Sequence, residues 1–294
     1  MMDAADHLLS SSSAITTDDW KACWRGRFLL HASSQPLPIS KQILGVALIL
    51  GGVHLIMTQS PPLLKVMFGE SHLATMKAKG KSLDSAVSNV LSGVLSGTVA
   101  FLYILGCSEV HGDLEGMVNS PTRPSTYGVT HTALTIHCGY TVYELIFYCF
   151  VPHNEATLMY FHHAIVLSNF LLNLLYASNH YYACLLGLTE ATNVCLAPIT
   201  FFKMVGKTSG PAFLTAAAGT WLGFLVLRLI LVPWWTYGVV SSLGAVRETY
   251  GEMPYRQLQL GIFSASLILA MSAFWFYKLT RIAVKMLKKT KEKA

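Results

Sequence analysis

Charged residues are scarce in this chain. Asp, Glu, Lys and Arg make up 12% of its 294 residues, whereas a soluble globular protein carries about 25%. The few charges cluster between long apolar runs, so the chain lacks the polar surface that would face water on all sides. This deficit excludes the ordinary soluble enzyme or binding module.

Several familiar signatures are absent as well. The sequence contains no Gly-x-Ser-x-Gly elbow, no phosphate-binding glycine loop and no Cys/His spacing typical of zinc sites. Its six cysteines show no paired spacing. Residues 1–40 have neither the order of a cleaved signal peptide nor the acid-poor composition of a mitochondrial presequence. We interpret them as a mostly disordered tail with a short interfacial helix around Trp20–Leu30.

The chain has instead long apolar runs. A spanning helix needs roughly 20 mostly apolar residues, and backbone groups in lipid must pair within their own segment. Seven such runs occur: Ile43–Thr58, Asp84–Cys107, Tyr127–Val151, Leu158–Tyr176, Tyr181–Phe202, Pro211–Val240 and Leu258–Leu279. Their connections are short. We therefore predict one all-α domain over residues 41–285, a multi-pass transmembrane bundle of about seven helices.

Lysine and arginine are distributed unevenly between the two ends of this bundle. The basic tail 286–294 falls on the same side as Lys65, Lys77, Lys79, Lys81, Lys203 and Lys207. The acidic connection within 108–126 falls on the opposite side. Basic residues favour the cytosolic side, so we expect a cytosolic C-terminus. The net charge of +6 comes largely from the tail, and we do not expect a nucleic-acid partner.

Ionisable side chains within spans are functional candidates by default. Here they gather in the middle of the chain: His131, His137 and Glu144, then His162 and His163 with Asn169 and Asn173, then Glu190 and Asn193, then Arg228. At helical spacing these residues form polar stripes on four neighbouring spans. Such stripes most economically line one shared cavity. The Gly93–Gly97 pair in the second run predicts close helix packing.

Partners for these residues can be anticipated. Arg228 needs a carboxylate, since an unpaired guanidinium in hydrocarbon is expensive, and Glu144 or Glu190 is the natural choice. His163 points about 100° away from His162 on a helix, so one imidazole orients the other or faces a neighbour. Three interpretations remain open for the pair: catalysis, interhelical hydrogen bonding and metal binding. The pair is too small a set for the spaced histidine boxes of membrane di-iron enzymes, so we expect no metal.

Four stretches carry a family resemblance: "GYTVYELIFY" (139–148), "YFHHAIVL" (160–167), "LTEATNVCLAPITFFKM" (188–204) and "GFLVLRLILVPWW" (223–235). Together and in this order they resemble the TLC-domain family, which includes the ceramide synthases and the translocon-associated TRAM proteins. The resemblance covers roughly residues 41–285. It implies a helical bundle around a central, lipid-accessible cavity.

The ceramide synthases imply a specific chemistry. Their adjacent histidines are essential for moving an acyl chain from acyl-CoA to a sphingoid base, and a His-Asp-x-x-Asp pattern follows. The matching positions here are Thr189, Glu190 and Asn193, so the second acidic residue is an amide. Asn193→Asp would restore that carboxylate. The departure brings the chain nearer to the smaller TLC-domain-containing proteins, whose roles concern membrane lipid composition.

We therefore expect an endoplasmic-reticulum protein that binds lipid or acyl chains in its cavity and influences lipid homeostasis, without a cofactor. The candidate catalytic residues are His162, His163 and Glu190, and the candidate lipid-binding residues are His137, Glu144, Asn169, Asn193 and Arg228. One alternative is a ceramide-synthase-like N-acyltransferase with acyl-CoA as co-substrate, in which Glu190 holds His162 in one tautomer. Another is a TRAM-like structural partner. A homodimer is a further expectation.

Overall fold

The structure, a computed structural model, describes residues 38–109, 124–150, 156–176 and 178–291. Within these ranges the regular elements are all helices, and no strand occurs. The helix expected around Trp20–Leu30 lies outside the described residues. The prediction of an all-helical fold is confirmed.

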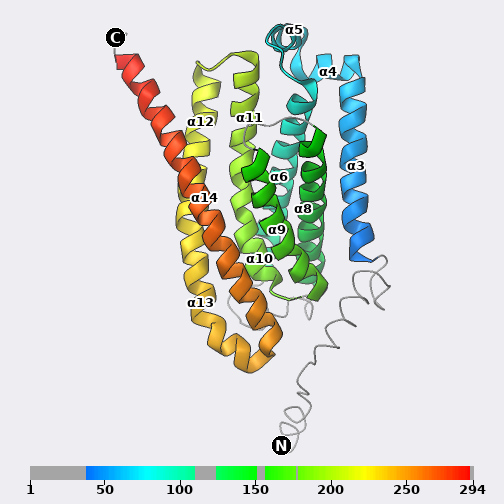
Figure 1. Ribbon diagram of the computed structural model, residues 1–294, viewed down its shortest axis with the longest axis vertical. Helices are drawn as coiled ribbons and strands as arrows, with labels where there is room; N and C mark the ends of the chain where they lie inside the picture. The colour runs from blue at the N-terminus through cyan, green and yellow to red at the C-terminus, as the bar shows by residue number, and fades with distance from the viewer. Residues whose placement is uncertain (1–37, 110–123, 151–155, 177, 292–294) are drawn as a thin grey trace, which may run out of the picture.

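Seven helical rods run alternately up and down the molecule (Figure 1). They are α3 (Ile39–Gln59), α6 (Leu83–Glu109), α8 (Pro124–Phe150), α9 (Ala156–Tyr176), the rod α10–η2–α11 (His180–Val205), the rod α12–η3–α13 (Pro211–Tyr250) and α14 (Glu252–Lys291). The start of α3 and the end of α14 lie at opposite ends of the bundle (Figure 1). An odd number of antiparallel rods produces this arrangement.

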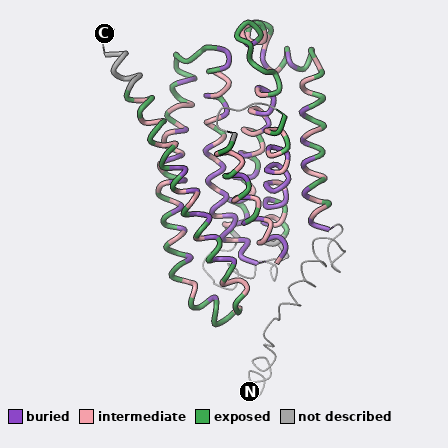
Figure 2. The backbone as a smooth tube through the Cα atoms, viewed as in Figure 1, coloured by how far each residue is buried: buried purple, intermediate pink, exposed green. Residues whose placement is uncertain are grey.

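Six of the seven rods are long and apolar enough to cross a membrane by length and composition, and α8 is the exception among the described helices. The sequence of α8 includes His131, His137 and Glu144. It packs against α3, α6 and α9, and buried positions gather on these central helices (Figure 2). Its polar side chains therefore face other helices, which explains why a helix of this length has a lower hydropathy than its neighbours.

Two rods are interrupted at their middles. A 3₁₀ segment, η2 (Leu188–Ala191), separates α10 (His180–Gly187) from α11 (Thr192–Val205). A π-helical segment, η3 (Phe224–Ile230), separates α12 (Pro211–Gly223) from α13 (Leu231–Tyr250). Pro233 follows η3 and has no N–H to donate to the preceding turn, a usual cause of such irregularity. The segments η2 and η3 contact each other.

Close helix packing brings α6 against α11. A Cβ atom on Gly93 would lie 2.8 Å from the Cβ of Ala197, and one on Gly97 would lie 3.3 Å from a methyl group of Val194. Only a hydrogen fits at the first position without a shift of the backbone. The prediction of a close contact at the Gly93–Gly97 pair is confirmed.

The connection between α3 and α6 is itself helical. It consists of α4 (Pro61–Phe68) and α5 (Glu70–Ala78). The bend between them is at Gly69, whose φ of +76° is one that glycine adopts without strain. These helices lie at the same end of the bundle as the α11–α12 connection and the C-terminus (Figure 1).

The helix ends differ from the predicted runs in the last third of the chain. The helix α13 continues to Tyr250, beyond the predicted end at Val240. The helix α14 extends from Glu252 to Lys291, beyond the predicted run Leu258–Leu279 and through most of the basic tail. Lys and Glu are good helix formers, so a helix can continue into this segment after the apolar run has ended.

Candidate functional site

A cavity of about 420 Å³ lies between the central helices and α14. Its lining comes from α6, α8, α9, η2, α11, η3 and α14 and comprises Asn89, Ser92, Tyr140, Glu144, Tyr148, Met159, His162, His163, Glu190, Asn193, Leu196, Ala197, Thr200, Lys203, Phe224, Arg228, Trp275, Lys278, Leu279 and Ile282. We call the buried polar set Glu144, His162, His163, Glu190 and Arg228 the floor. We call Lys203 and Lys278, both exposed, the mouth.

The cavity is elongated along the bundle. Glu190 of the floor and Lys203 of the mouth stand 13 residues apart on one continuous rod, which corresponds to about 20 Å of helix. Between these levels the wall is mixed: Met159, Leu196 and Trp275 are apolar. Asn89, Ser92 and Thr200 are polar. The cavity thus combines a polar inner end, walls with both apolar and polar surface, and a basic outer end.

One side of the floor is an imidazole paired with a carboxylate. The Nε2 of His163 lies 3.1 Å from Oε2 of Glu144, and both side chains are buried. The ring of Tyr148 stacks on the His163 ring, with 6° between their planes and 5.6 Å between their centroids. Tyr148 follows Glu144 by four residues, so one face of α8 supplies both the carboxylate and the stacked ring. These contacts fix the orientation of the His163 ring.

The other side of the floor is a buried guanidinium. Arg228 of η3 places Nη2 3.9 Å from Oε1 of Glu190 in η2. It also donates from Nε to the hydroxyl of Thr192 at 3.1 Å and from Nη2 to the carbonyl of Thr189 at 3.3 Å. Its guanidinium lies over the Phe224 ring, 5.0 Å from the centroid. Of the two expected partners of Arg228, Glu144 and Glu190, it is Glu190 that lies beside it. The contacts come from η2, from η3 and from Thr192, the first residue of α11.

Asn193 is part of the same network. Its side-chain amide donates to Oε2 of Glu190 at 2.9 Å and to the hydroxyl of Ser96 at 3.3 Å. The amide is therefore a partner of Glu190 and neutral itself. A carboxylate at position 193 would remove both donations and place a second negative charge beside Glu190.

The expected contact between His162 and Glu190 is not formed. No nitrogen–oxygen distance of 4.0 Å or less joins these two residues, and the Glu190 carboxylate is held by Arg228 and Asn193. The carboxylate-held imidazole is His163, and its carboxylate is Glu144. The expectation that Glu190 holds His162 is therefore wrong, because the spacing within each span does not fix which side chains of two different spans meet.

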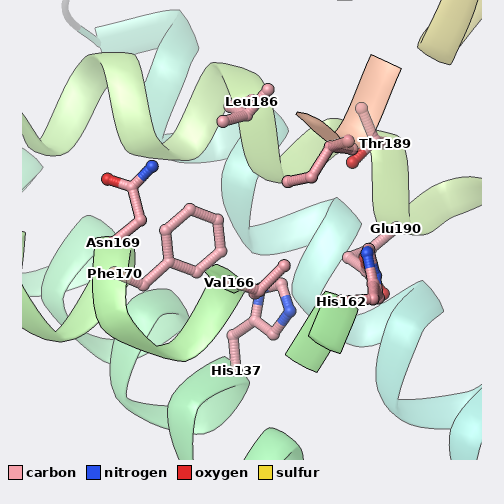
Figure 3. A pocket seen from close by; sticks show the side chains of 9 residues that line it. His137, His162, Val166, Asn169, Phe170, Leu186, Thr189 and Glu190 are labelled. Carbon is pink, nitrogen blue, oxygen red and sulfur yellow. The ribbon is translucent and has the colours of Figure 1, made fainter. Parts of the chain in front are cut away.

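His162 lies at the junction of the cavity and a smaller void. Its ring packs edge-on to Trp275, with centroids 5.9 Å apart, and its buried Nδ1 has no hydrogen-bond partner in the described part of the chain. Figure 3 shows the void, with His162 and Glu190 at one edge and His137, Phe170 and Asn169 around the rest. The void measures about 10 Å³, which is room for about one water molecule.

Two predicted lipid-binding residues line the void and do not line the cavity. His137 is joined through Nδ1 to the hydroxyl of Tyr103 at 2.7 Å and packs edge-on to Phe170. Asn169 accepts a hydrogen bond on its backbone carbonyl from the side chain of Asn173. His137 thus connects α8 to α6 and α9, whereas the hydrogen bond of Asn169 stays within α9. The other six predicted site residues all line the cavity.

Several residues that line the cavity were not predicted from the sequence. Tyr148 could have been found, because its spacing from Glu144 places both on one helical face. Asn89, which donates to the carbonyl of Ala197 at 2.6 Å, and Ser92, which is 2.6 Å from the hydroxyl of Tyr140, are single polar residues in an apolar run. Nothing in the sequence identifies Trp275 as a cavity residue, since the aromatic residues of the last run also fit a lipid-facing surface.

The described residues contain no group of three or more His, Cys, Asp or Glu side chains arranged to hold a metal ion. The floor pairs four of its five ionisable groups, His163 with Glu144 and Arg228 with Glu190. These four each have a partner of complementary chemistry within the protein, as buried charges require, whereas the Nδ1 of His162 has no partner in the described part of the chain.

Comparison with known proteins gives a family. A model of the TLC domain matches residues 83–281, a range that contains the four stretches singled out in the sequence and every residue of the floor. No curated protein is similar enough to match the chain. Because the domain match spans more than half of the chain and covers the bundle from α6 to most of α14, the protein belongs to the TLC-domain family of multi-pass membrane proteins.

Proposed function

We propose that the protein binds a lipid or an acyl chain in the cavity and thereby influences membrane lipid composition. The observation that carries the proposal is the form of the cavity, in which a buried polar floor lies beneath walls that include the apolar side chains of Met159, Leu196 and Trp275. Its volume of about 420 Å³ lies within the range of about 300–1,000 Å³ that is usual for small-molecule sites. An amphiphile matches this arrangement, with its head group on the floor and its chain along the walls.

The floor favours a head group that forms hydrogen bonds without carrying a strong charge. Arg228 and Glu190 already face each other, and Asn193 completes the carboxylate's contacts. His162 and His163 each have a buried Nδ1 without a partner among the described residues, and both border the cavity. The His163 ring is held through Nε2 by Glu144, which leaves His162 as the imidazole of the floor without a carboxylate partner. An imidazole nitrogen can donate to or accept from a hydroxyl or amide. A bare anion would compete with Glu190 for Arg228 at a high desolvation cost.

We further propose that the mouth opens to the cytosolic side of an endoplasmic-reticulum membrane. The mouth lies at the end of the bundle that carries α4, α5 and their lysines (Figure 1), and basic residues favour the cytosolic side. Protease treatment of sealed microsomes tests this. A C-terminal tag should be digested, and a protected tag would contradict the orientation.

Mass spectrometry of the purified protein tests lipid binding. His162→Ala should lower the amount of co-purified lipid severalfold, and His162→Gln should restore part of it because an amide keeps a donor and an acceptor. Ser266→Ala is the matched control, since Ser266 is exposed and donates to the carbonyl of Ile262 in its own helix. Unchanged lipid in the His162→Ala protein would overturn the proposal.

A second candidate function is acyl transfer from acyl-CoA to an amine, and one observation favours it. The imidazole of His163 lies on the cavity floor and is held by the carboxylate of Glu144. An imidazole held in this way is the arrangement of a general base. The base would take the amine's proton as the amide bond forms and the thiol of CoA departs. Robust ceramide formation by the purified wild-type protein, lost in His163→Gln, would replace lipid binding by this activity.

A further inference from the structure

A second hollow lies at the lysine-rich end of the bundle, on the outside of α4 and α5. It measures about 600 Å³ and is lined by Thr58, Pro61, Leu64, Lys65, Leu73, Ala74, Lys77, Lys81 and Leu83. None of these residues lines the central cavity. Most of them also precede residue 83, where the TLC-domain match begins. The hollow is therefore a feature separate from the site described above.

The hollow carries two positive charges without a negative partner in the described residues. The ammonium of Lys65 is paired with the carboxylate of Glu70 at 2.7 Å, so the two charges compensate each other. Lys77 and Lys81 are exposed, and among the described side chains neither has a carboxylate within 4.0 Å. The nearby Asp84 is 3.4 Å from the ring of His54. The rim is thus basic on the side of Lys77 and Lys81.

Lys79 shows that the lysines of this segment are not equivalent. Its ammonium lies against Gly206, where a Cβ atom would clash with it. Gly206 ends α11 with a φ of +77°, so Lys79 sits at the C-terminus of that helix, where a cation is favourable. Lys79 helps to join α5 to α11, whereas Lys77 and Lys81 face the hollow.

The surface around the hollow is apolar at the level where the spans end. Leu64 and Phe68 of α4 are buried, but Val66 is 84% exposed and Leu63 is 37% exposed. An exposed aliphatic side chain of this kind is stable when its helix lies at the boundary between head groups and acyl chains. The Leu64, Leu73 and Leu83 side chains continue this apolar surface into the hollow.

We propose that the hollow binds one anionic phospholipid, with its phosphate between Lys77 and Lys81 and an acyl chain along Leu64, Leu73 and Leu83. The charge of the rim complements the phosphate, and the apolar floor complements the chain. The hollow lies at the level of the head groups, where juxtamembrane lysines attract anionic lipids. This site is independent of what the central cavity binds.

Native mass spectrometry of the full-length protein with phosphatidylserine and phosphatidylcholine tests the proposal. The wild-type protein should retain phosphatidylserine preferentially. Lys77→Gln with Lys81→Gln should reduce that preference roughly 5- to 25-fold, since each lysine near a charged surface contributes about fivefold. Lys207→Gln with Arg281→Gln is the matched control, because it removes two exposed charges that line neither hollow nor cavity. The control should keep the wild-type preference.

A second variant tests the acyl-chain part of the site. Ala74 is exposed on the lining, so Ala74→Trp fills the hollow without changing its charge. It should lower phosphatidylserine retention severalfold. Equal retention by the wild type and the lysine double variant would overturn the proposal. Unchanged retention together with loss of a dimer in the lysine variant would also overturn it, because the surface would then serve a second copy of the chain.

Discussion

Each side of the cavity floor pairs a buried carboxylate with a nitrogen-bearing side chain, but the two sides use different backbone conformations. On one side, regular helices α8 and α9 bring the imidazole of His163 to Glu144. On the other side, a 3₁₀ segment and a π-helical segment bring the guanidinium of Arg228 to Glu190. Both carboxylates are buried, and buried carboxylates need a partner. The difference lies in how many further groups each side uses.

The regular side relies on side chains alone. Glu144 and Tyr148, one turn apart, hold His163 by an ion contact and a stacked ring. The interrupted side also uses the backbone. The carbonyl of Thr189 accepts from Arg228 and from the hydroxyl of Thr192. Irregular turns inside helices expose such carbonyls and are frequent at functional sites. The guanidinium of Arg228, with its five donors, thus uses a carbonyl of the 3₁₀ segment in addition to side-chain acceptors.

The largest effect should follow removal of the guanidinium. Arg228→Met leaves Glu190 buried without its cation and should lower the free energy of unfolding by about 3–5 kcal/mol. Arg228→Met combined with Glu190→Gln removes both charges and should recover much of this loss. Denaturant unfolding in detergent measures both variants. If the double variant is no more stable than Arg228→Met, the paired arrangement is not what stabilises this side of the floor.

A smaller loss should follow Asn193→Asp. The substitution removes the donation to Glu190 and adds a carboxylate at a half-buried position beside it, which should cost about 3 kcal/mol. It should therefore not create activity, although it restores the acidic pattern of the ceramide synthases. Unfolding and ceramide synthesis are measured on the same preparation. A stable and newly active variant would show that Glu190 and position 193 can share the site as two acids.

Gly187, at the start of η2, tests how tightly the interrupted rod is packed. A Cβ atom there would lie 2.2 Å from the buried ring of Tyr103, whose hydroxyl contacts His137. Gly187→Ala should cost about 1–3 kcal/mol through overpacking. Gly45→Ala is the control, since nothing lies within 4 Å of a Cβ at that position. Equal stability of the two variants would mean that the rod can move away from Tyr103.

The smallest effect concerns an ion pair outside the spans. The hydrogen bond and charge of Lys65 hold the pKa of Glu70 below its ordinary value. The stabilisation is therefore present at neutral pH and is lost as the pH falls through the Glu70 pKa. Because both groups are exposed, the effect on unfolding should be slight. Carboxyl NMR should show the Glu70 pKa rising in Lys65→Gln, and an unchanged value would exclude the pair in solution.

The sequence predicts the fold and most of the cavity because regular helices repeat every 3.6 residues. The apolar runs locate the rods, and the polar stripes place Glu144, His162 and His163 on neighbouring faces. The partner of Arg228 follows from the cost of an unpaired buried cation.

The pairing of the histidines could not be predicted in the same way. Glu144 and His163 lie on two different regular helices, and helical spacing gives the faces of one helix but not its rotation or register against another. Glu190 was therefore expected beside His162 on its chemistry alone, and the role of Asn193 as a hydrogen-bond donor was not anticipated.

Photo-crosslinking with a diazirine-bearing lipid tests most directly whether lipid enters the cavity. The labelled lipid is incorporated during expression, the protein is irradiated in native membranes, and the modified residues are mapped by mass spectrometry. If lipid binds in the cavity, we expect labels on Met159 and Trp275, with the Trp275 label reduced in His162→Ala. Labels confined to outward-facing residues such as Leu48 and Ile49, which are 66% and 67% exposed, would show that lipid surrounds the bundle without entering it and would contradict the account.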